Sequence, residues 1–244
     1  MKKKIITILG TRPEIIRLSC ILNKLDKNFN HILINTNQNY DKNLNSIFFQ
    51  QLEIKKPKYF LKNISNKSPI QFIGKALIEI DNIIIKEKPD GILVLGDTNS
   101  SLTSISAKKR KIPIFHIEAG NRCFDQRVPE EINRKIVDHI SDINMTYSNY
   151  AKQNLLTEGI KHDRIIKIGS PLFEVYNYYE TQINKSKILE KFKLNKNKFI
   201  LASVHREENV DLDKNLNEII KSLNKLIKKF KIPVIFSTHP RTRE

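Results

Sequence analysis

Residues 116–134 hold a dense group of ionisable side chains that could move protons beside a bound anion. Glu118 directly follows an apolar run typical of a buried strand. A helix is expected over residues 129–140, with Glu130 in its first turn and Arg134 four residues later. The pattern indicates acid–base chemistry, but it also fits an ordinary surface ion pair between Glu130 and Arg134, worth about 0.3 kcal/mol.

Two other expected strands end in polar residues. The apolar run 91–96 leads into Asp97, and the run 4–9 leads into Gly10-Thr11-Arg12 at the start of a helix. Parallel sheets bind ligands at the carboxyl ends of their strands. A helix amino end and a forked guanidinium suit a phosphate, so Arg12 indicates a diphosphate site. An ordinary strand–loop–helix junction has the same appearance, and the spaced glycines of dinucleotide-binding and phosphate-binding loops are missing here.

Strand-like and helix-like segments alternate along the chain, which predicts an α/β fold with a parallel sheet covered on both faces. Strands are expected at 4–9, 31–36, 91–97, 112–117, 142–146, 164–168, 199–204 and 233–237. Helices are expected from about 15 to 25, and at 43–52, 69–86, 100–109, 129–140, 150–158, from 171 to about 192, and 212–229. We place one domain at 1–168 and the first part of a second at 169–244.

Composition excludes several classes of protein. The chain has 244 residues, is 39% hydrophobic and carries a formal net charge of +17. Its lysines are spread along the whole sequence without interleaved aromatic residues, so no nucleic-acid surface is expected. No apolar run is long enough to span a membrane and no signal peptide is visible, which indicates a cytoplasmic protein. Two cysteines, Cys20 and Cys123, suit a reducing compartment, and Cys123 is a weak candidate for a nucleophile.

Seven motifs in chain order resemble the non-hydrolysing UDP-N-acetylglucosamine 2-epimerase family. They are Gly10-Thr-Arg-Pro-Glu14, Gln38-Asn-Tyr-Asp41, Gly96-Asp-Thr98, His116-Ile-Glu-Ala-Gly120, Pro129-Glu-Glu-Ile-Asn-Arg134, Gly169-Ser-Pro171 and His205-Arg-Glu-Glu-Asn209. The second motif and the loop 121–127 look like the branch that serves capsule and O-antigen sugars. The resemblance implies two Rossmann-like domains of the GT-B type with the active site between them, the second domain being incomplete in this sequence.

The resemblance also implies a mechanism. Members of the family remove the C2 proton of a UDP-amino sugar while UDP leaves C1, and then add UDP back to the resulting glucal. The positions matching the family's catalytic groups are Asp97, Glu118, Glu130 and His205, and those matching its substrate and UDP contacts are Arg12, Arg17, Gln38, Arg134 and His205. Asn37 precedes Gln38 where relatives often have glycine, and asparagine tolerates a positive φ better than most residues.

The resemblance requires no metal or other cofactor, and the six histidines show no ligand spacing. The expected partner is a UDP-amino sugar, with a 6-deoxy or diacetamido-uronic UDP-sugar as the alternative. A homodimer is expected for a complete enzyme, and a missing C-terminal segment could act in trans. Two alternatives to an active epimerase remain: an inactive or split half-enzyme that keeps ligand or partner binding, and, more distantly, a glycosyltransferase. We expect the 244-residue chain by itself to be nearly inactive, because the resemblance implies that half of the residues that bind UDP in the family lie outside this sequence.

Overall fold

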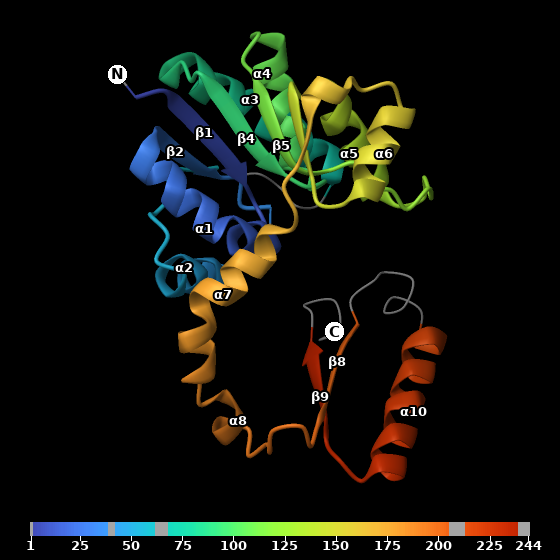
Figure 1. Cartoon of the computed structure of the whole chain (residues 1–244). Coiled ribbons are helices and arrows are strands. Elements are labelled where there is room, and N and C mark those ends of the chain that lie inside the picture. Colours follow the sequence, from blue (N-terminus) through green and yellow to red (C-terminus); the bar gives the residue numbers. More distant parts are fainter. Residues whose placement is uncertain (1, 39–41, 62–67, 205–212, 239–244) are drawn as a thin grey trace. The chain divides into compact units, whose positions relative to one another are not determined.

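The computed structural model describes residues 2–38, 42–61, 68–204 and 213–238. The chain forms two compact units, Met1–Tyr179 and Glu180–Glu244. The predicted α/β class is confirmed, because strands and helices alternate through both units (Figure 1). The expected domain boundary at 168/169 stays a prediction; by compactness the first unit also includes the first part of the helix that begins at Pro171.

The first unit is built on a seven-stranded parallel sheet with the order β3-β2-β1-β4-β5-β6-β7. Its strands are β1 (Lys4–Leu9), β2 (Asn30–Asn35), β3 (Tyr59–Phe60), β4 (Gly91–Leu95), β5 (Ile114–Ala119), β6 (Ile143–Thr146) and β7 (Ile165–Lys167). The chain first builds β1, β2 and β3 in one direction and then returns to the other side of β1 with β4. Strand order therefore reverses beside β1, and such a reversal is where open α/β sheets bind ligands.

Helices connect these strands. They are α1 (Arg12–Asn28), α2 (Lys42–Gln51), α3 (Pro69–Glu87), the 3₁₀ turn η1 (Ser101–Thr103), α4 (Ser104–Lys109), α5 (Pro129–Ile140), α6 (Asn149–Thr157), the 3₁₀ turn η2 (His162–Arg164) and α7 (Pro171–Asn184). Local sequence explains several ends. Proline occupies the first turn of α1, α3 and α5, and α3 ends at Lys88, whose backbone is left-handed.

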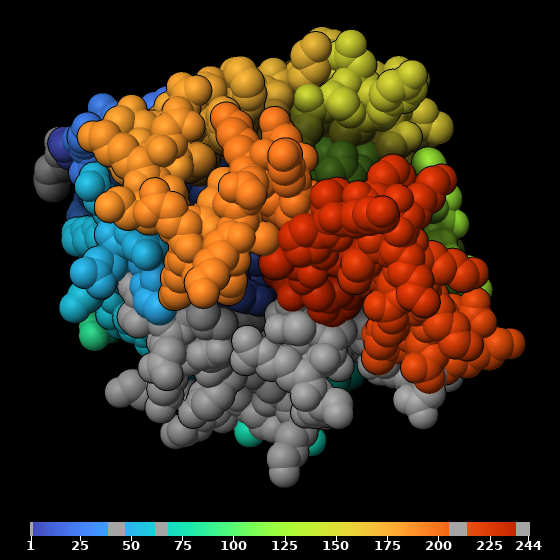
Figure 2. Space-filling model, turned by 90° about the horizontal axis from the view of Figure 1, so that it is seen from below, coloured from blue at the N-terminus to red at the C-terminus, as the bar shows by residue number. Residues whose placement is uncertain are grey.

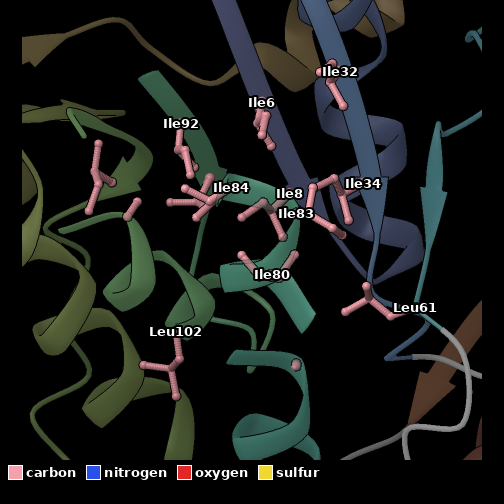
Figure 3. Packing of buried hydrophobic residues seen from close by; sticks show 14 of the residues in the cluster. Ile6, Ile8, Ile32, Ile34, Leu61, Ile80, Ile83, Ile84, Ile92 and Leu102 are labelled. Carbon is pink, nitrogen blue, oxygen red and sulfur yellow. The ribbon is translucent and has the colours of Figure 1, made fainter. Parts of the chain in front are cut away.

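The sheet has a separate apolar core on each face. On one face, Ile6, Ile34 and Ile92 point toward Ile80 and Ile84 of α3, as Figure 3 shows. The same cluster extends to η1, α4 and α5. On the other face, buried apolar residues of β1, β2, β4 and β5 pack against α1 and α2. Successive side chains of a strand alternate between faces, so each buried strand needs apolar residues on both sides, and these strands read as continuous apolar runs.

Helix α7 belongs to the first unit through its first half. Val175 and Tyr179 are buried against Cys20 of α1, and the Tyr179 hydroxyl donates a 2.6 Å hydrogen bond to the carbonyl of Leu52. In the space-filling view, the gold residues of the first half of α7 lie beside blue residues of the first unit (Figure 2). This contact fixes the start of α7 on the outside of α1 and α2.

The second unit contains α8 (Ile188–Lys191), β8 (Ile200–Val204), α10 (Asp213–Phe230) and β9 (Val234–Thr238). Strands β8 and β9 pair in parallel, with Ile200 opposite Val234 and Val204 opposite Thr238. The expected strand–helix–strand order over 199–237 is confirmed. It forms a parallel βαβ arrangement, as in the first unit.

One expectation about a helix was wrong, and one short strand was not expected. The single helix expected from 171 to about 192 is broken after Asn184, and a separate short helix begins at Ile188. Ser186 lies in the break and its hydroxyl accepts from the amide of Ile188, a local bond that competes with the helical one. The short strand β3 was not predicted, because two residues give no periodicity.

Candidate active site

The candidate active site lies at the carboxyl ends of β1, β4 and β5, next to the reversal of strand order. Glu118 is the first component. Between β5 and β6 the register shifts between Ile117 and Ala119, so Glu118 is an inserted residue, and its φ is +70°. A bulge of this kind redirects a side chain near the end of a strand.

The bulge changes the face to which Glu118 points. Ile117 packs on the α1 side of the sheet, whereas His116 contacts α5 on the other side. Regular alternation would therefore place Glu118 on the α5 side. Instead its carboxylate forms an ion pair with Arg17 of α1, which is 101 residues away in sequence.

Asp97 is the second component. It follows β4 and Gly96, whose φ is +69°. Arg134 of α5 binds the Asp97 carboxylate, donates a 2.6 Å hydrogen bond to the carbonyl of Glu118, and lies 3.7 Å from Glu118 Oε1. Two carboxylates from neighbouring strand ends are thus gathered around two guanidinium groups.

Burial and the neighbouring charges both act on the pKa of the Asp97 carboxyl. Burial raises the pKa of the Asp97 carboxyl above its ordinary value, and the charges of Glu118 and Glu130 raise it further, while Arg134 lowers it. An acid with a raised pKa holds and releases a proton more readily near neutral pH. The arrangement can therefore supply one carboxyl group as an acid and another as a base.

Helix α5 also fixes the loops that carry these groups. The Asn133 amide donates to the carbonyl of Asp97 at 2.9 Å. The buried Glu131 carboxylate accepts from the amides of Cys123 and Phe124, in the loop that follows Glu118. Neighbouring residues of one helix turn thus hold the backbone around both carboxylates, and Arg134 binds their side chains.

Glu14 joins the first loop to the loop of Asp97. It is 1% exposed, and its Oε2 accepts from the amides of Gly10 and Thr11 and from the Thr11 hydroxyl. Its Oε1 accepts from the Thr98 hydroxyl at 3.0 Å. Burial raises the pKa of Glu14 to about 7, although all four donors oppose the rise. An acid of this kind is half-ionised at neutral pH.

The Gly10 loop also meets the ends of β2 and β4. A Cβ at Gly10 would lie 2.1 Å from Thr36 Oγ1 and 2.3 Å from Ser100 Oγ, so only glycine fits there. Gln38 accepts from both the amide and the hydroxyl of Ser100. Asn37 has a φ of +55°, a conformation that asparagine tolerates better than most residues. Three connecting loops are thereby held together.

The structure brings together four predicted site residues: Asp97, Glu118, Arg17 and Arg134. Arg134 is buried, so the alternative of a surface ion pair with Glu130 is wrong. Glu130 itself is exposed at the start of α5, within range for its charge to act on Asp97.

The other predicted site residues lie at the start of α1, in the loop after β2 or outside the described residues. Arg12 is half-buried at the start of α1, and Gln38 lies in the neighbouring loop. His205 lies outside the described residues, as does His239. Their expected roles stay predictions.

Sequence reasoning missed Glu14 and Tyr147. The Tyr147 hydroxyl is buried, and burial together with the nearby charge of Glu118 raises the pKa of the phenol. Tyr147 directly follows β6, so it occupies the same kind of strand-end position as Asp97 and Glu118. Position after an apolar strand was therefore a usable signal for Tyr147. Glu14 gave no such signal, because a glutamate in the first turn of a helix is ordinary.

Comparison with known proteins assigns the family. A family model described as UDP-N-acetylglucosamine 2-epimerase matches residues 23–244. The chain belongs to this family. A structure of UDP-N-acetylglucosamine 2-epimerase from Rickettsia bellii superimposes with a TM-score of 0.92 at 48% identity, covering 100% of this chain and 64% of that one.

Two further members of the UDP-N-acetylglucosamine 2-epimerase family are similar. The enzyme of Methanocaldococcus jannaschii, crystallised with UDP-GlcNAc and UDP, has a TM-score of 0.89 at 40% identity, covering 100% of this chain and 67% of that one. The UDP-2,3-diacetamido-2,3-dideoxy-D-glucuronate 2-epimerase of Pseudomonas aeruginosa is 39% identical over 98% of this chain and 68% of its own length. The chain thus spans about two thirds of these relatives.

Among the described residues, no group of three or more histidine, cysteine or acidic side chains is arranged to hold a metal ion. None of the helices within the described ranges is long and apolar enough to cross a membrane.

Proposed function

We propose that this protein interconverts the C2 epimers of a UDP-amino sugar by eliminating UDP and adding it back. The observation that carries the proposal is the gathering of Asp97 and Glu118 around Arg17 and Arg134, beside the loop of Arg12. Membership of the UDP-N-acetylglucosamine 2-epimerase family supports the same reaction.

The C2 hydrogen of such a sugar is not acidic enough for simple removal at neutral pH, so its loss must accompany loss of the leaving group. In the proposed forward step a carboxylate takes the C2 proton. The electron pair of the C2–H bond forms a C1=C2 double bond, and the C1–O bond breaks with its pair going to the β-phosphate oxygen of UDP. The products of this step are UDP and a 2-acetamidoglucal.

The return step delivers a proton to the opposite face of C2, and the UDP oxygen attaches again to C1. Two proton-handling groups are needed, one for each face, and Asp97, Glu118 and Glu130 are the proposed candidates. Burial and the neighbouring acids raise the pKa of Asp97, which suits the role of general acid among these three carboxyl groups.

The leaving diphosphate also needs positive charge and donors. We assign this task to Arg12 and to the amino end of α1, with Gln38 as a further substrate contact. His205 is proposed to meet the departing diphosphate as an imidazolium, by its place in the family motif. Arg17 and Arg134 are proposed to hold the carboxylates in place.

The test is solvent isotope exchange. The full-length protein is incubated with UDP-N-acetylglucosamine in deuterated water, and deuterium at C2 and appearance of the C2 epimer are followed by NMR. A double variant, Asp97→Asn with Glu118→Gln, purified in the same way, controls for epimerases of the expression host. Exchange by the wild type and its loss in the double variant would support the proposal; equal signals in both, or none in either, would contradict it.

The same assay selects the sugar. The relative from Pseudomonas aeruginosa is named for a diacetamido-glucuronate substrate, whereas that from Methanocaldococcus jannaschii is named for UDP-N-acetylglucosamine, and their identities to this chain are 39% and 40%. Sequence identity therefore does not show which of the two sugars is the substrate. We propose that the substrate is one of these two or a 6-deoxy relative, and the sugar with the highest kcat/KM identifies it.

A homodimer is proposed as the assembly of the full-length protein. Light scattering coupled to size-exclusion chromatography measures its mass directly, and a monomer at micromolar concentration would contradict the proposal.

A further inference from the structure

Three buried ionisable residues behind the candidate site form a connected network with the partly exposed Glu158. His116 and Asp138 are both 0% exposed, and His116 Nδ1 lies 2.9 Å from Asp138 Oδ1. Asp138 Oδ2 lies 2.7 Å from Arg122, whose side chain is also fully buried. Arg122 in turn binds both oxygens of Glu158, at 2.7 and 2.6 Å. None of these groups takes part in the proposed reaction, and burying three ionisable side chains needs a physical reason.

The network connects to the backbone at two places, each close to a carboxylate of the site. His116 Nε2 lies 2.8 Å from the carbonyl of Gly96, the residue before Asp97. Asp138 accepts from the amide of Gly120, two residues after Glu118, at 3.2 Å to each oxygen. A carbonyl oxygen can only accept, so Nε2 carries the hydrogen of the first contact.

Both anchored glycines have left-handed backbone, with φ of +69° at Gly96 and +78° at Gly120. Glu118 between them has φ of +70°. Glycine adopts a positive φ without strain, but Glu118 keeps this conformation only where its surroundings enforce it. The His116–Asp138 pair supplies that constraint from the α5 side of the sheet, opposite to the side on which Arg17 binds Glu118.

We propose that Asp138, acting through His116 and the Gly120 amide, is a positioning residue that sets the spacing of the Asp97 and Glu118 carboxylates. The proposal rests on the proposed function, since it concerns the two acids of that reaction. Asp138 contacts neither acid directly: it fixes the backbone on both sides of the pair, and the bulge at Glu118 depends on it.

The test compares Asp138→Asn with Asp142→Asn in the full-length protein. Asp142 is a matched control, because it also pairs with a cation, Lys108 at 2.7 Å, and accepts from a backbone amide of β5. That amide belongs to Ile114, at the opposite end of the strand from Glu118. The two variants remove the same charge and the same kind of bond from the two ends of β5.

We expect Asp138→Asn to lower kcat by about 10- to 100-fold, because a shift of about 1 Å in a reacting group has an effect of this size. KM should change by less than about threefold, since the proposed UDP contacts are elsewhere. Asp142→Asn should leave both constants near those of the wild type. A folded Asp138→Asn protein with normal kcat, or an equal loss of kcat in both variants, would overturn the proposal.

Hydrogen exchange gives a readout that does not depend on any reaction. In Asp138→Asn, peptides covering residues 96–98 and 119–123 should exchange faster, whereas in Asp142→Asn the change should be confined to the start of β5. If the wild type turns over no sugar, the proposed function fails, and this pattern still decides the positioning role. Unchanged exchange at both loops would overturn it.

His116→Gln serves if Asp138→Asn does not fold. A glutamine amide can donate to the Gly96 carbonyl or to Asp138, but its single nitrogen does not sit at both positions of the ring. Turnover should therefore fall in the same direction, with faster exchange at residues 96–98. Normal turnover and normal exchange in a folded His116→Gln protein would overturn the proposal.

Discussion

Glu14→Gln should change the pH dependence of stability in a direction that the structure fixes. Glu14 is 1% exposed, and burial raises its pKa from 4.5 to about 7. Because the folded pKa lies above the unfolded one, the folded state binds a proton more tightly. Stability from this group is therefore fully present below pH 4.5 and is lost as the pH rises through about 7.

The size of the effect follows from the same two values. The rise in the pKa of Glu14 from 4.5 to about 7 corresponds to about 3 kcal/mol of unfolding free energy. Wild type should lose up to this amount between pH 4.5 and 8 because of Glu14, and the glutamine variant should not. The variant should thus gain about 3 kcal/mol relative to wild type over that range.

Glutamine keeps an acceptor for most of the donors that bind Glu14. Its oxygen can take the place of Glu14 Oε2, which accepts from Gly10 N at 2.9 Å and from Thr11 N at 2.7 Å. Its amide nitrogen then faces the Thr98 hydroxyl, which can accept as well as donate. The substitution therefore removes the charge and keeps the bonds to Gly10 and Thr11.

The measurement is urea unfolding followed by circular dichroism at pH 5, 6, 7 and 8. Two compact units can unfold in separate transitions, so the transition that the substitution shifts is the one to compare. Glu180→Gln, at an exposed position, controls for loss of a carboxylate from the surface. A Glu14→Gln protein that becomes less stable than wild type as the pH rises would show that the four donors outweigh burial, and the reasoning would be refuted.

Asp97→Asn, Glu118→Gln and Glu130→Gln should each lower turnover about a hundredfold or more, the usual scale for loss of a general acid or base. Near-normal turnover and C2 exchange in all three would contradict the proton-transfer assignment. Arg12→Ala should weaken UDP binding, measured by calorimetry, and slow the reaction as well; unchanged affinity and rate would exclude Arg12 from the site. Gly120→Ala should destabilise the fold by about 2 kcal/mol or more, because φ there is +78° and the new Cβ would lie 2.2 Å from a backbone oxygen of α6. An unchanged Tm would count against that reasoning.

The sequence by itself determined the alternation of strands and helices and the residues at strand ends. The bounds of β1 and α5 agree with expectation, because an apolar run before a glycine and a proline followed by acids are local signals. Asp97 and Glu118 were identified as site residues on the same basis, since parallel strands bring their carboxyl ends to one edge.

Only the tertiary structure decided how these residues face one another. The bulge that turns Glu118 toward Arg17 depends on the pairing of β5 with β6, and no local pattern specifies it. Likewise, the pKa of Glu14 depends on burial among groups from the ends of β1 and β4, and the role of Asp138 depends on its closeness to His116. Such effects arise from desolvation and from contacts distant in sequence, which residue order alone does not contain.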